Sequence, residues 1–413
     1  MASSLPDSPS LERLKADARH LQREVRTGDA QAIALVRSLH PTADTVLRQR
    51  GTFPLHAAQL SVARKFGFDG WPALVHYLAV AAQLSRDPGG VAENSLDPAD
   101  RFCALACLRY ADTDGPQRWQ AAAEVLAQEQ GVVASSVWAA SAACDPEAIR
   151  SHLDRDWGLA RRPGGPFDWP PLLYLSYSRV PVPRTEEELV AAATALLEAG
   201  ADPDSGYLWR GLSSPFTALT GAFGHGEQGP RRLPAHQHAH ALARLLLDAG
   251  ADPNDSQTLY NRMFTPADDH LELLLGYGLG GPATGPWARR LGQAMETPEQ
   301  MLRRQVQWAA DHGFTERLGL LSRYGVDVAG VPVVTWRVPD DPDIKVGGRT
   351  ALHEAAWDGD LDRIRALLAA GAEPTVRDDE HAGTPLDWAE YAFQEDAARL
   401  LRQVAPRTDD GVG

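Results

Sequence analysis

Residues 348–372 constrain the fold of this chain more than any other segment, because two short helices and their ends can be read directly from them. Thr350 is placed to cap the first helix, and Gly359 with Asp360 breaks that helix into a turn. Gly371 closes the second helix as a left-handed C-terminal cap. The apolar faces are Leu352, Ala355 and Ala356 in the first helix, then Leu361, Ile364, Leu367 and Leu368 in the second. The segment therefore predicts a helix–turn–helix unit that buries one face of each helix.

The closing element of this unit, two leucines followed by glycine, an apolar residue and an acid, recurs along the chain. It reads LLEAGADPD, LLLDAGADPN, LLSRYGVDV and LLAAGAEPT, with weaker echoes elsewhere. The marker glycines are Gly131, Gly158, Gly200, Gly250, Gly278, Gly325 and Gly371. In these features the chain resembles the ankyrin repeat family, whose unmodified unit has about 33 residues. The resemblance implies an all-α ankyrin-repeat solenoid of about seven to nine stacked helix pairs, with irregular insertions.

The segment before the array has a separate character. Its first apolar stripe is Leu11, Leu14, Ala18, Leu21 and Val25, and a second one follows the break at Gly28, so a helix hairpin is expected. From Pro54 the chain resembles a helical segment that often precedes ankyrin repeats in bacterial proteins, with Ala-Gln-Leu, Gly-Phe and Trp-Pro in order. We therefore expect residues 1–82 to form a helical N-terminal cap over the first repeat. Residues 83–99 then form a linker, 100–404 the array and 405–413 a flexible tail.

Composition narrows the classes of partner and compartment. The net charge is −15, which argues against a nonspecific grip on nucleic acid, because that affinity comes from Lys and Arg neutralising phosphates. No long apolar run or secretory leader is visible, so export and membrane spanning are not expected. Only three lysines occur, a composition typical of a GC-rich bacterial genome. These features predict a cytoplasmic, monomeric protein that binds a protein or a basic surface.

Insertions on a rigid scaffold are the natural places for recognition. The turn between paired helices is swollen after Ser178 and after Phe223, and the finger that joins consecutive units is lengthened after Pro203 and after Asp327. In the last finger, apolar residues alternate with others often enough to predict a short β-hairpin. Aromatic and arginine side chains there are the types enriched at binding hot spots. The predicted partner-binding residues are Tyr207, Trp209, Arg210, Trp336, Arg337, Trp357 and Asp358. The alternative is that the aromatic residues fold back to cover the long loops.

Two metal hypotheses compete with simpler interpretations. His236 and His240 would share a helix face if the helix began near Pro234, with His225, His238, Asp269 and His270 as further candidates. The simpler interpretation is a solvated histidine tract. Cys103 and Cys107 lie one helical turn apart and could hold a metal, or they are small core residues. No metal or cofactor is predicted from either group.

No enzyme signature is present in the sequence, neither a nucleophile elbow nor a phosphate loop nor a zinc-protease helix. His353 is interpreted as structural, because the family's Thr-Pro-Leu-His pattern uses this histidine to hold the turn. The sequence therefore predicts a non-enzymatic scaffold that binds a protein through its fingers and first helices. The alternative is an ankyrin-fold enzyme or metal-dependent protein that uses the inserted loops as a site.

Overall fold

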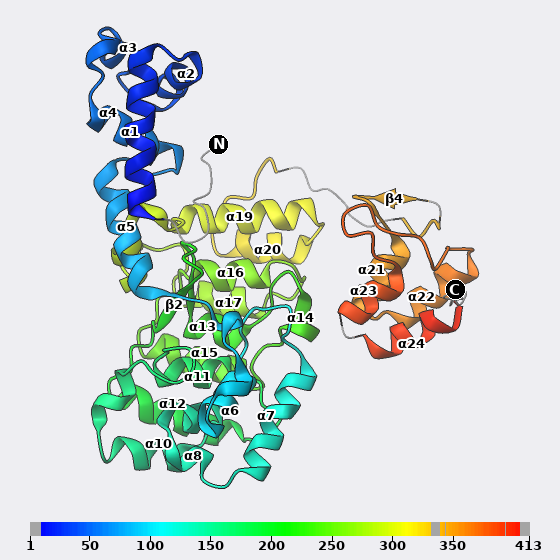
Figure 1. The fold of residues 1–413 in the computed structure, drawn as a ribbon. Coiled ribbons are helices and arrows are strands. Elements are labelled where there is room, and N and C mark those ends of the chain that lie inside the picture. The colour runs from blue at the N-terminus through cyan, green and yellow to red at the C-terminus, as the bar shows by residue number, and fades with distance from the viewer. Residues whose placement is uncertain (1–9, 332–338, 343, 393, 405–413) are drawn as a thin grey trace, which may run out of the picture.

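The computed structural model describes residues 10–331, 339–342, 344–392 and 394–404. It is mostly helical, with about 60% helix and 4% strand, so the all-α prediction holds for the bulk of the chain. Three parts can be followed in Figure 1: an N-terminal arm (residues 11–84), a body (85–331) and a C-terminal unit (344–404). Within the described ranges, no helix combines the length and apolar character needed to cross a membrane.

The N-terminal arm is a set of antiparallel helices that projects from the body. Its elements are α1 (Leu11–Thr27), α2 (Ala30–Leu39), α3 (Ala43–Leu47), η1 (Arg50–Thr52), α4 (Leu55–Lys65) and α5 (Trp71–Leu84). The predicted hairpin is confirmed, since Leu14, Ala18, Leu21 and Val25 are buried and Gly28 adopts a left-handed φ of 90°.

The main contacts of the arm with the body are made with segments far from the first helix pair in sequence. Helix α5 packs on α18 (Pro286–Leu291) and η5 (Gly292–Ala294), far along the chain. The His76 Nε2 atom lies 2.9 Å from the Arg290 carbonyl, and the Tyr77 hydroxyl donates to the Gly211 carbonyl. The arm therefore braces residues 286–294 and the lengthened finger after Pro203, where the sequence analysis expected a cap on the first repeat.

The body is built from helix pairs. Its first helices are α6 (Pro98–Ala106), α9 (Val137–Ala142), α11 (Pro171–Tyr177), α13 (Ala218–Phe223), α16 (Ser256–Arg262) and α19 (Pro298–Asp311). The second helices are α7 (Pro116–Gln128), α10 (Pro146–Leu153), α12 (Glu186–Glu198), α15 (Ala239–Asp248), α17 (Asp269–Gly276) and α20 (Thr315–Arg323). Consecutive first helices pack on each other from α6 to α19, and α10, α12 and α15 form a second layer. Short elements between them are η2 (Pro88–Gly90), η3 (Glu93–Ser95), α8 (Val132–Ser135), η4 (Trp157–Arg161) and α14 (Gly229–Arg232).

Two small sheets depart from a purely helical fold. Strand β2 (Gly206–Trp209) pairs in parallel with β1 (Ser85–Arg86) and antiparallel with β3 (Pro215–Thr217). This hairpin occupies the finger after Pro203, where the sequence analysis predicted no strand. The second sheet joins β4 (Lys345–Val346) to β5 (Arg349–Thr350). The hairpin predicted after Asp327 lies mainly in residues 332–338, outside the described residues.

The marker glycines test the repeat pattern residue by residue. Gly131, Gly200, Gly250, Gly278, Gly325 and Gly371 all have φ between 82° and 101°, a region that L side chains rarely adopt. Gly158 is the exception, because it lies inside η4 and has no left-handed φ. The closing glycine is thus a reliable signal of a helix end where two leucines precede it, and Gly158 was one of the weaker echoes.

The C-terminal unit contains two helix pairs with a hydrophobic core of its own. They are α21 (Ala351–Asp358) with α22 (Leu361–Ala369), and α23 (Pro385–Tyr391) with α24 (Glu395–Val404). Its buried residues form a cluster separate from that of the body. As predicted, Thr350 caps α21 and Gly359 ends it with a φ of 69°. His353 Nδ1 lies 2.8 Å from Thr350 Oγ1, and His353 Nε2 lies 3.1 Å from the Gly383 carbonyl, which fits the structural role expected for this histidine.

Candidate functional site

Tyr207, one of the predicted partner-binding residues, is buried. Strand β2 turns its ring into the body, where it stacks on Trp169 with ring centres 4.9 Å apart. Phe216 and Tyr177 contact the same ring. The prediction of an exposed Tyr207 is therefore wrong, because a strand sends alternate side chains to opposite faces and this one faces the core. The fold-back alternative is correct for this residue.

Trp209 and Arg210 lie at the exposed end of the same hairpin. The Arg210 guanidinium lies 4.8 Å from the centre of the Trp209 ring, and its Nε is 3.2 Å from an Asp87 carboxylate oxygen. Trp209 is half-buried, whereas Arg210 and the neighbouring Leu212 are exposed. The finger thus presents a small surface, but its cation is already paired within the chain.

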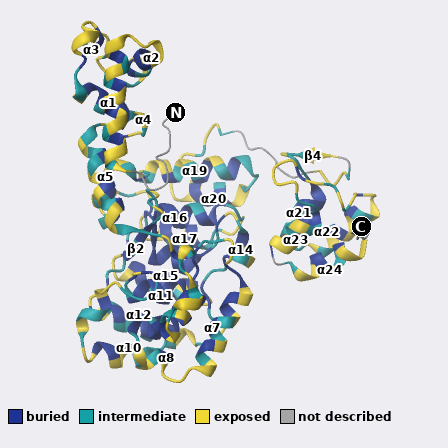
Figure 2. Ribbon diagram, viewed as in Figure 1, coloured by how far each residue is buried: buried dark blue, intermediate teal, exposed yellow. Residues whose placement is uncertain are grey.

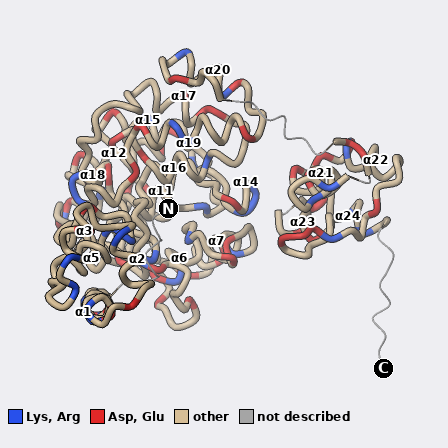
Figure 3. The backbone as a smooth tube through the Cα atoms, turned by 90° about the horizontal axis from the view of Figure 1, so that it is seen from above, with Lys and Arg blue, Asp and Glu red and all other residues tan. Residues whose placement is uncertain are grey.

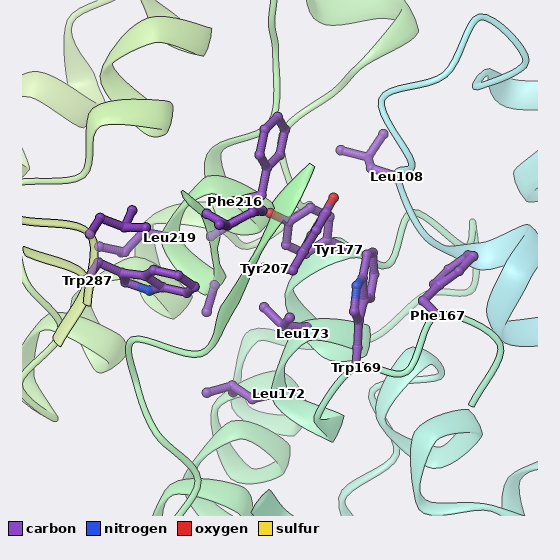
Figure 4. Close-up of a cluster of buried hydrophobic side chains, with 14 of the residues drawn as sticks. Leu108, Phe167, Trp169, Leu172, Leu173, Tyr177, Tyr207, Phe216, Leu219 and Trp287 are labelled. Atoms are coloured by element: carbon purple, nitrogen blue, oxygen red, sulfur yellow. The ribbon is translucent and has the colours of Figure 1, made fainter. Parts of the chain in front are cut away.

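Two first helices of the body, α11 and α13, offer no further surface. Every residue of α11 and of α13 is buried, and Figure 2 shows the same dark interior through α15, α16 and α17. A cluster of aromatic side chains fills the space beside these helices (Figure 4). Its labelled aromatic members are Phe167, Trp169, Tyr177, Tyr207, Phe216 and Trp287. In α11 and α13, the face that a first helix would present to a partner is part of the core.

The C-terminal unit keeps aromatic side chains near its surface. We call Trp357, Trp388 and Tyr391 the aromatic trio. The rings of Trp357 and Trp388 are 5.8 Å apart edge-to-face, and those of Trp357 and Tyr391 are 6.1 Å apart and stacked. Both tryptophans are half-buried, while Tyr391 is 40% exposed and Asp358 is exposed. Burial raises the pKa of the Tyr391 hydroxyl, and the nearby Arg232 charge opposes that rise.

Hydrogen bonds from neighbouring residues hold the aromatic trio and the end of α21 in place. The Asp378 carboxylate accepts the Trp388 indole N–H at 3.0 Å and the backbone N–H groups of Gly383 and His381. The Gln394 side chain donates to the Trp357 carbonyl at 2.9 Å. These bonds fix the orientation of Trp388 and the end of α21. The aromatic surface is therefore held by the scaffold before any partner arrives.

The body reaches the trio through α14. The Arg232 guanidinium lies 4.2 Å from the centre of the Tyr391 ring, and its Nε donates to the Tyr391 carbonyl at 3.3 Å. The Trp357 ring lies against Gly229, where an added Cβ would stand 3.1 Å from Trp357 Cζ2. Figure 3 shows α14 and α23 on the facing sides of the two parts. Trp357 is therefore partly covered by the chain itself.

Two further predicted residues, Trp336 and Arg337, lie outside the described residues. The finger that carries them starts after Asp327 and ends at β4, so it leads directly into the C-terminal unit. Their role as partner-binding residues stays a prediction.

The two swollen turns meet at a small cavity. It has a volume of about 180 Å³ and lies between the segment after Ser178 and the segment around Pro234. Arg179 closes its base with hydrogen bonds to the carbonyls of Pro234, Ser176 and Gly221. Each of these bonds ties one turn to another element. The cavity thus lies beside Arg179, whose hydrogen bonds hold the inserted turns on the body.

Cys144 and His236 lie together at the wall of this cavity. Their Sγ and Nε2 atoms are 3.8 Å apart, and His236 Nδ1 accepts the His238 backbone N–H. Burial raises the pKa of the Cys144 thiol to about 12 and lowers the pKa of His236 well below its usual value. Both groups are therefore neutral at pH 7, so they do not form the thiolate–imidazolium pair that a cysteine nucleophile needs.

The histidine metal hypothesis rested on a helix that began near Pro234. Helix α15 begins instead at Ala239, so His236 and His240 do not share its face. His240 pairs with Asp269 at 2.8 Å, as part of a contact that also includes Arg262 at 2.6 Å. Over the ranges that the structure covers, no group of three or more His, Cys, Asp or Glu side chains is placed to hold a metal ion.

Cys103 and Cys107 are both buried in and just after α6. Burial raises the pKa of the Cys103 thiol, and the Cys107 pKa is raised in the same way. The Cys107 Sγ lies 3.5 Å from the Tyr174 carbonyl. Because metal binding needs thiolates, this environment favours the interpretation as core residues.

Some residues of this surface were missed by the sequence analysis. Trp388 and Tyr391 are three positions apart, which places them on one face of a helix, so their pairing could have been read from the sequence. The contact of Gly229 and Arg232 with the trio could not, since more than a hundred residues separate these positions.

Comparison with protein family models identifies one ankyrin repeat in the C-terminal unit. The ankyrin repeat family model matches residues 347–379. The matched segment contains α21, α22 and the finger that ends near Asp379. Ankyrin repeats are general protein–protein interaction modules. The chain therefore contains an ankyrin repeat, and that repeat carries Trp357 and Asp358.

Proposed function

Starting from the ankyrin repeat at residues 347–379, we propose that this protein is an adaptor that binds another protein through its C-terminal unit. We propose further that the helix pairs of the body continue the repeat as an irregular ankyrin-type solenoid. The stacking of first helices on first helices and the left-handed closing glycines support this extension.

The observation that carries the proposal is the contrast in exposure between the first helices. In α11 and α13 every residue is buried, whereas α21 and α23 carry the half-exposed aromatic trio. Tryptophan and tyrosine are enriched among residues that dominate binding energy, and a rigid helical support spends little entropy on association. The proposed contact surface is the trio with Asp358, together with Trp336 and Arg337 in the adjoining finger.

The remaining features of the function are proposals of the same kind. We propose a non-catalytic, monomeric protein of bacterial type that acts in the cytoplasm and binds neither nucleic acid nor membranes. The net charge of −15 supports a partner with a basic surface. The arm would then serve as the helical segment that precedes the repeats and braces the body.

The test is capture of a partner from the cell extract by the intact chain and by a triple variant. Trp336→Ala, Arg337→Ala and Trp357→Ala together are expected to weaken partner binding at least about tenfold, since a desolvated Trp or Arg contributes about 2 kcal/mol. The melting temperature should be nearly unchanged.

A matched control is Trp157→Ala, because Trp157 is 60% exposed in the body and lies outside the proposed surface. Capture by this variant should equal that of the parent. If the triple variant also captures as much partner as the parent, recognition does not use the C-terminal unit. The swollen turns at residues 179–188 and 224–238 are then the surfaces to test.

A further inference from the structure

The contact between α14 and the aromatic trio resembles a bound peptide more than a packed interface between two domains. Helix α14 has only four residues, Gly229–Arg232, and belongs to the swollen turn after Phe223. Pro230 and Arg231 are exposed, while Gly229 is buried and Arg232 is half-buried. Gly229 and Arg232 make the main contact, three positions apart on one turn of helix, and the adjacent Gln228 side chain also interacts with the Tyr391 hydroxyl.

Arg232 supplies the polar half of this contact. Its guanidinium lies 4.2 Å from the centre of the Tyr391 ring, and both Nε and Nη2 are 3.3 Å from the Tyr391 carbonyl oxygen. On its other side, Nη1 donates to the Asp112 carbonyl at 2.5 Å. A planar guanidinium that stacks on an aromatic ring and donates to a nearby carbonyl is a recognition geometry that lysine cannot reproduce.

Gly229 supplies the apolar half. Its φ of 79° suits glycine, and an added Cβ would stand 3.1 Å from Trp357 Cζ2. The indole therefore lies against bare backbone. The surface of the trio accepts an occupant that combines a glycine with an arginine three residues later.

The charge of the C-terminal unit fits a cationic occupant. Residues 345–404 contain twelve Asp and Glu against seven Lys and Arg, a net charge of −5. Asp358 is exposed beside Trp357. An arginine that approaches the trio from outside therefore enters a field of favourable sign.

We propose that the trio recognises an arginine-bearing protein segment of the pattern Gly-x-x-Arg, and that α14 occupies the same place in the free chain. This inference rests on the proposed function and names both the partner's chemistry and its competitor. A partner must displace α14, so the apparent affinity of the intact chain is the intrinsic affinity reduced by the fraction of molecules in which the trio is open.

The test uses a fluorescein-labelled peptide with residues 226–235 of the chain itself, GEQGPRRLPA, and fluorescence anisotropy with the full-length protein. In the protein, Arg232→Ala removes the internal competitor and should tighten peptide binding at least about fivefold. Gly229→Ala, which places a methyl group against Trp357, should act in the same direction. Tyr391→Ala should weaken binding at least about tenfold.

Matched controls separate this effect from general charge. Arg231→Ala in the protein removes an exposed arginine next to the contact and should leave peptide affinity unchanged. Tyr324→Ala removes a tyrosine that is 45% exposed at the end of α20 and should also have no effect. A peptide with alanine at the position of Arg232 should bind at least about tenfold more weakly, whereas alanine at the position of Arg231 should be tolerated.

Equal peptide affinity of the parent and both the Arg232→Ala and Gly229→Ala proteins would overturn the internal-competitor model. Unchanged binding by Tyr391→Ala would overturn recognition of arginine by the trio. Partner capture by the triple variant uses no peptide and therefore reports on the proposed function alone. Loss of capture together with no peptide binding would reject this inference and leave the proposed function standing.

Discussion

The body and the C-terminal unit share a local sequence pattern, but they use the resulting helices differently. In both, the helices come in pairs, and α12, α15, α20 and α22 each end at a left-handed glycine. In the body, strand β3 packs on α13 and α16, and the aromatic side chains around α11 and α13 form a core. In the C-terminal unit, α14 and the adjacent Gln228 approach the aromatic side chains. A repeat pattern therefore predicts the scaffold, while the segments that cover it decide whether its inner face is a core or a binding surface.

The fingers of the two regions differ in their electrostatics as well. In the body, burial raises the pKa of Asp204 to about 7, and Asp202, Asp252 and Asp255 add to the rise. In the C-terminal unit, burial alone would also raise the pKa of Asp378, but the N–H groups that surround its carboxylate lower it well below the usual range. The body thus holds a carboxyl that favours its proton, and the C-terminal unit holds a stabilised carboxylate.

The largest expected effect tests whether the two cores are independent. Leu367 is 2% exposed inside the C-terminal core, and an aspartate there has no partner, so Leu367→Asp should cost at least about 4 kcal/mol. Amide hydrogen exchange should show loss of protection in residues 345–404, including α23 and α24, with the body unchanged.

The control is Leu367→Met, which nearly conserves volume and should cost less than about 1.5 kcal/mol. Equal loss of protection in the body and in the C-terminal unit would show that the cores are coupled. A Leu367→Asp protein that melts within a degree or two of the parent would show that the helix register is wrong.

A smaller effect follows from Asp204. Its folded pKa of about 7 lies above the usual value near 3.9, so the folded chain binds more protons between these limits and loses stability as pH rises through them. Asp204→Asn keeps an oxygen that can accept the Asp252 N–H, now 2.9 Å away, but cannot ionise. Relative to the parent, this variant should gain about 2 kcal/mol of unfolding free energy between pH 5 and pH 8.

Urea unfolding at the two pH values measures this difference. Glu299→Gln is the matched control, because the Glu299 side chain is 81% exposed and does not contribute to the raised pKa of Asp204. If the unfolding free energy of Asp204→Asn differs from that of the parent by the same amount at pH 5 and at pH 8, the Asp204 carboxyl does not titrate as described.

Local signals in the sequence were sufficient for the helices and their ends. The stripe at Leu14, Ala18, Leu21 and Val25 and the caps at Thr350 and Gly371 depend on residues three or four positions apart. Such patterns survive in any tertiary context that buries one face. The first helix pair of the C-terminal unit was therefore predicted almost residue by residue.

Contacts between distant segments had no such signal. The pairing of β1 with β2 joins Ser85 to Leu208, and the docking of α5 on α18 joins residues more than two hundred positions apart. Tyr207 was placed on the surface because its finger is a loop in sequence, yet the strand pairing turns it inward. The same limit hid the contact of α14 with Tyr391.

The most direct test of the central claim is amide hydrogen exchange of the full-length chain, with and without the partner that it captures. The claim is that recognition lies on the aromatic trio of the C-terminal unit, not on the covered first helices of the body. We expect new protection in residues 351–359 and 385–391, with faster exchange in residues 226–233 as α14 is displaced. Protection confined to residues 206–217 or to the swollen turn at residues 179–188 would contradict the claim.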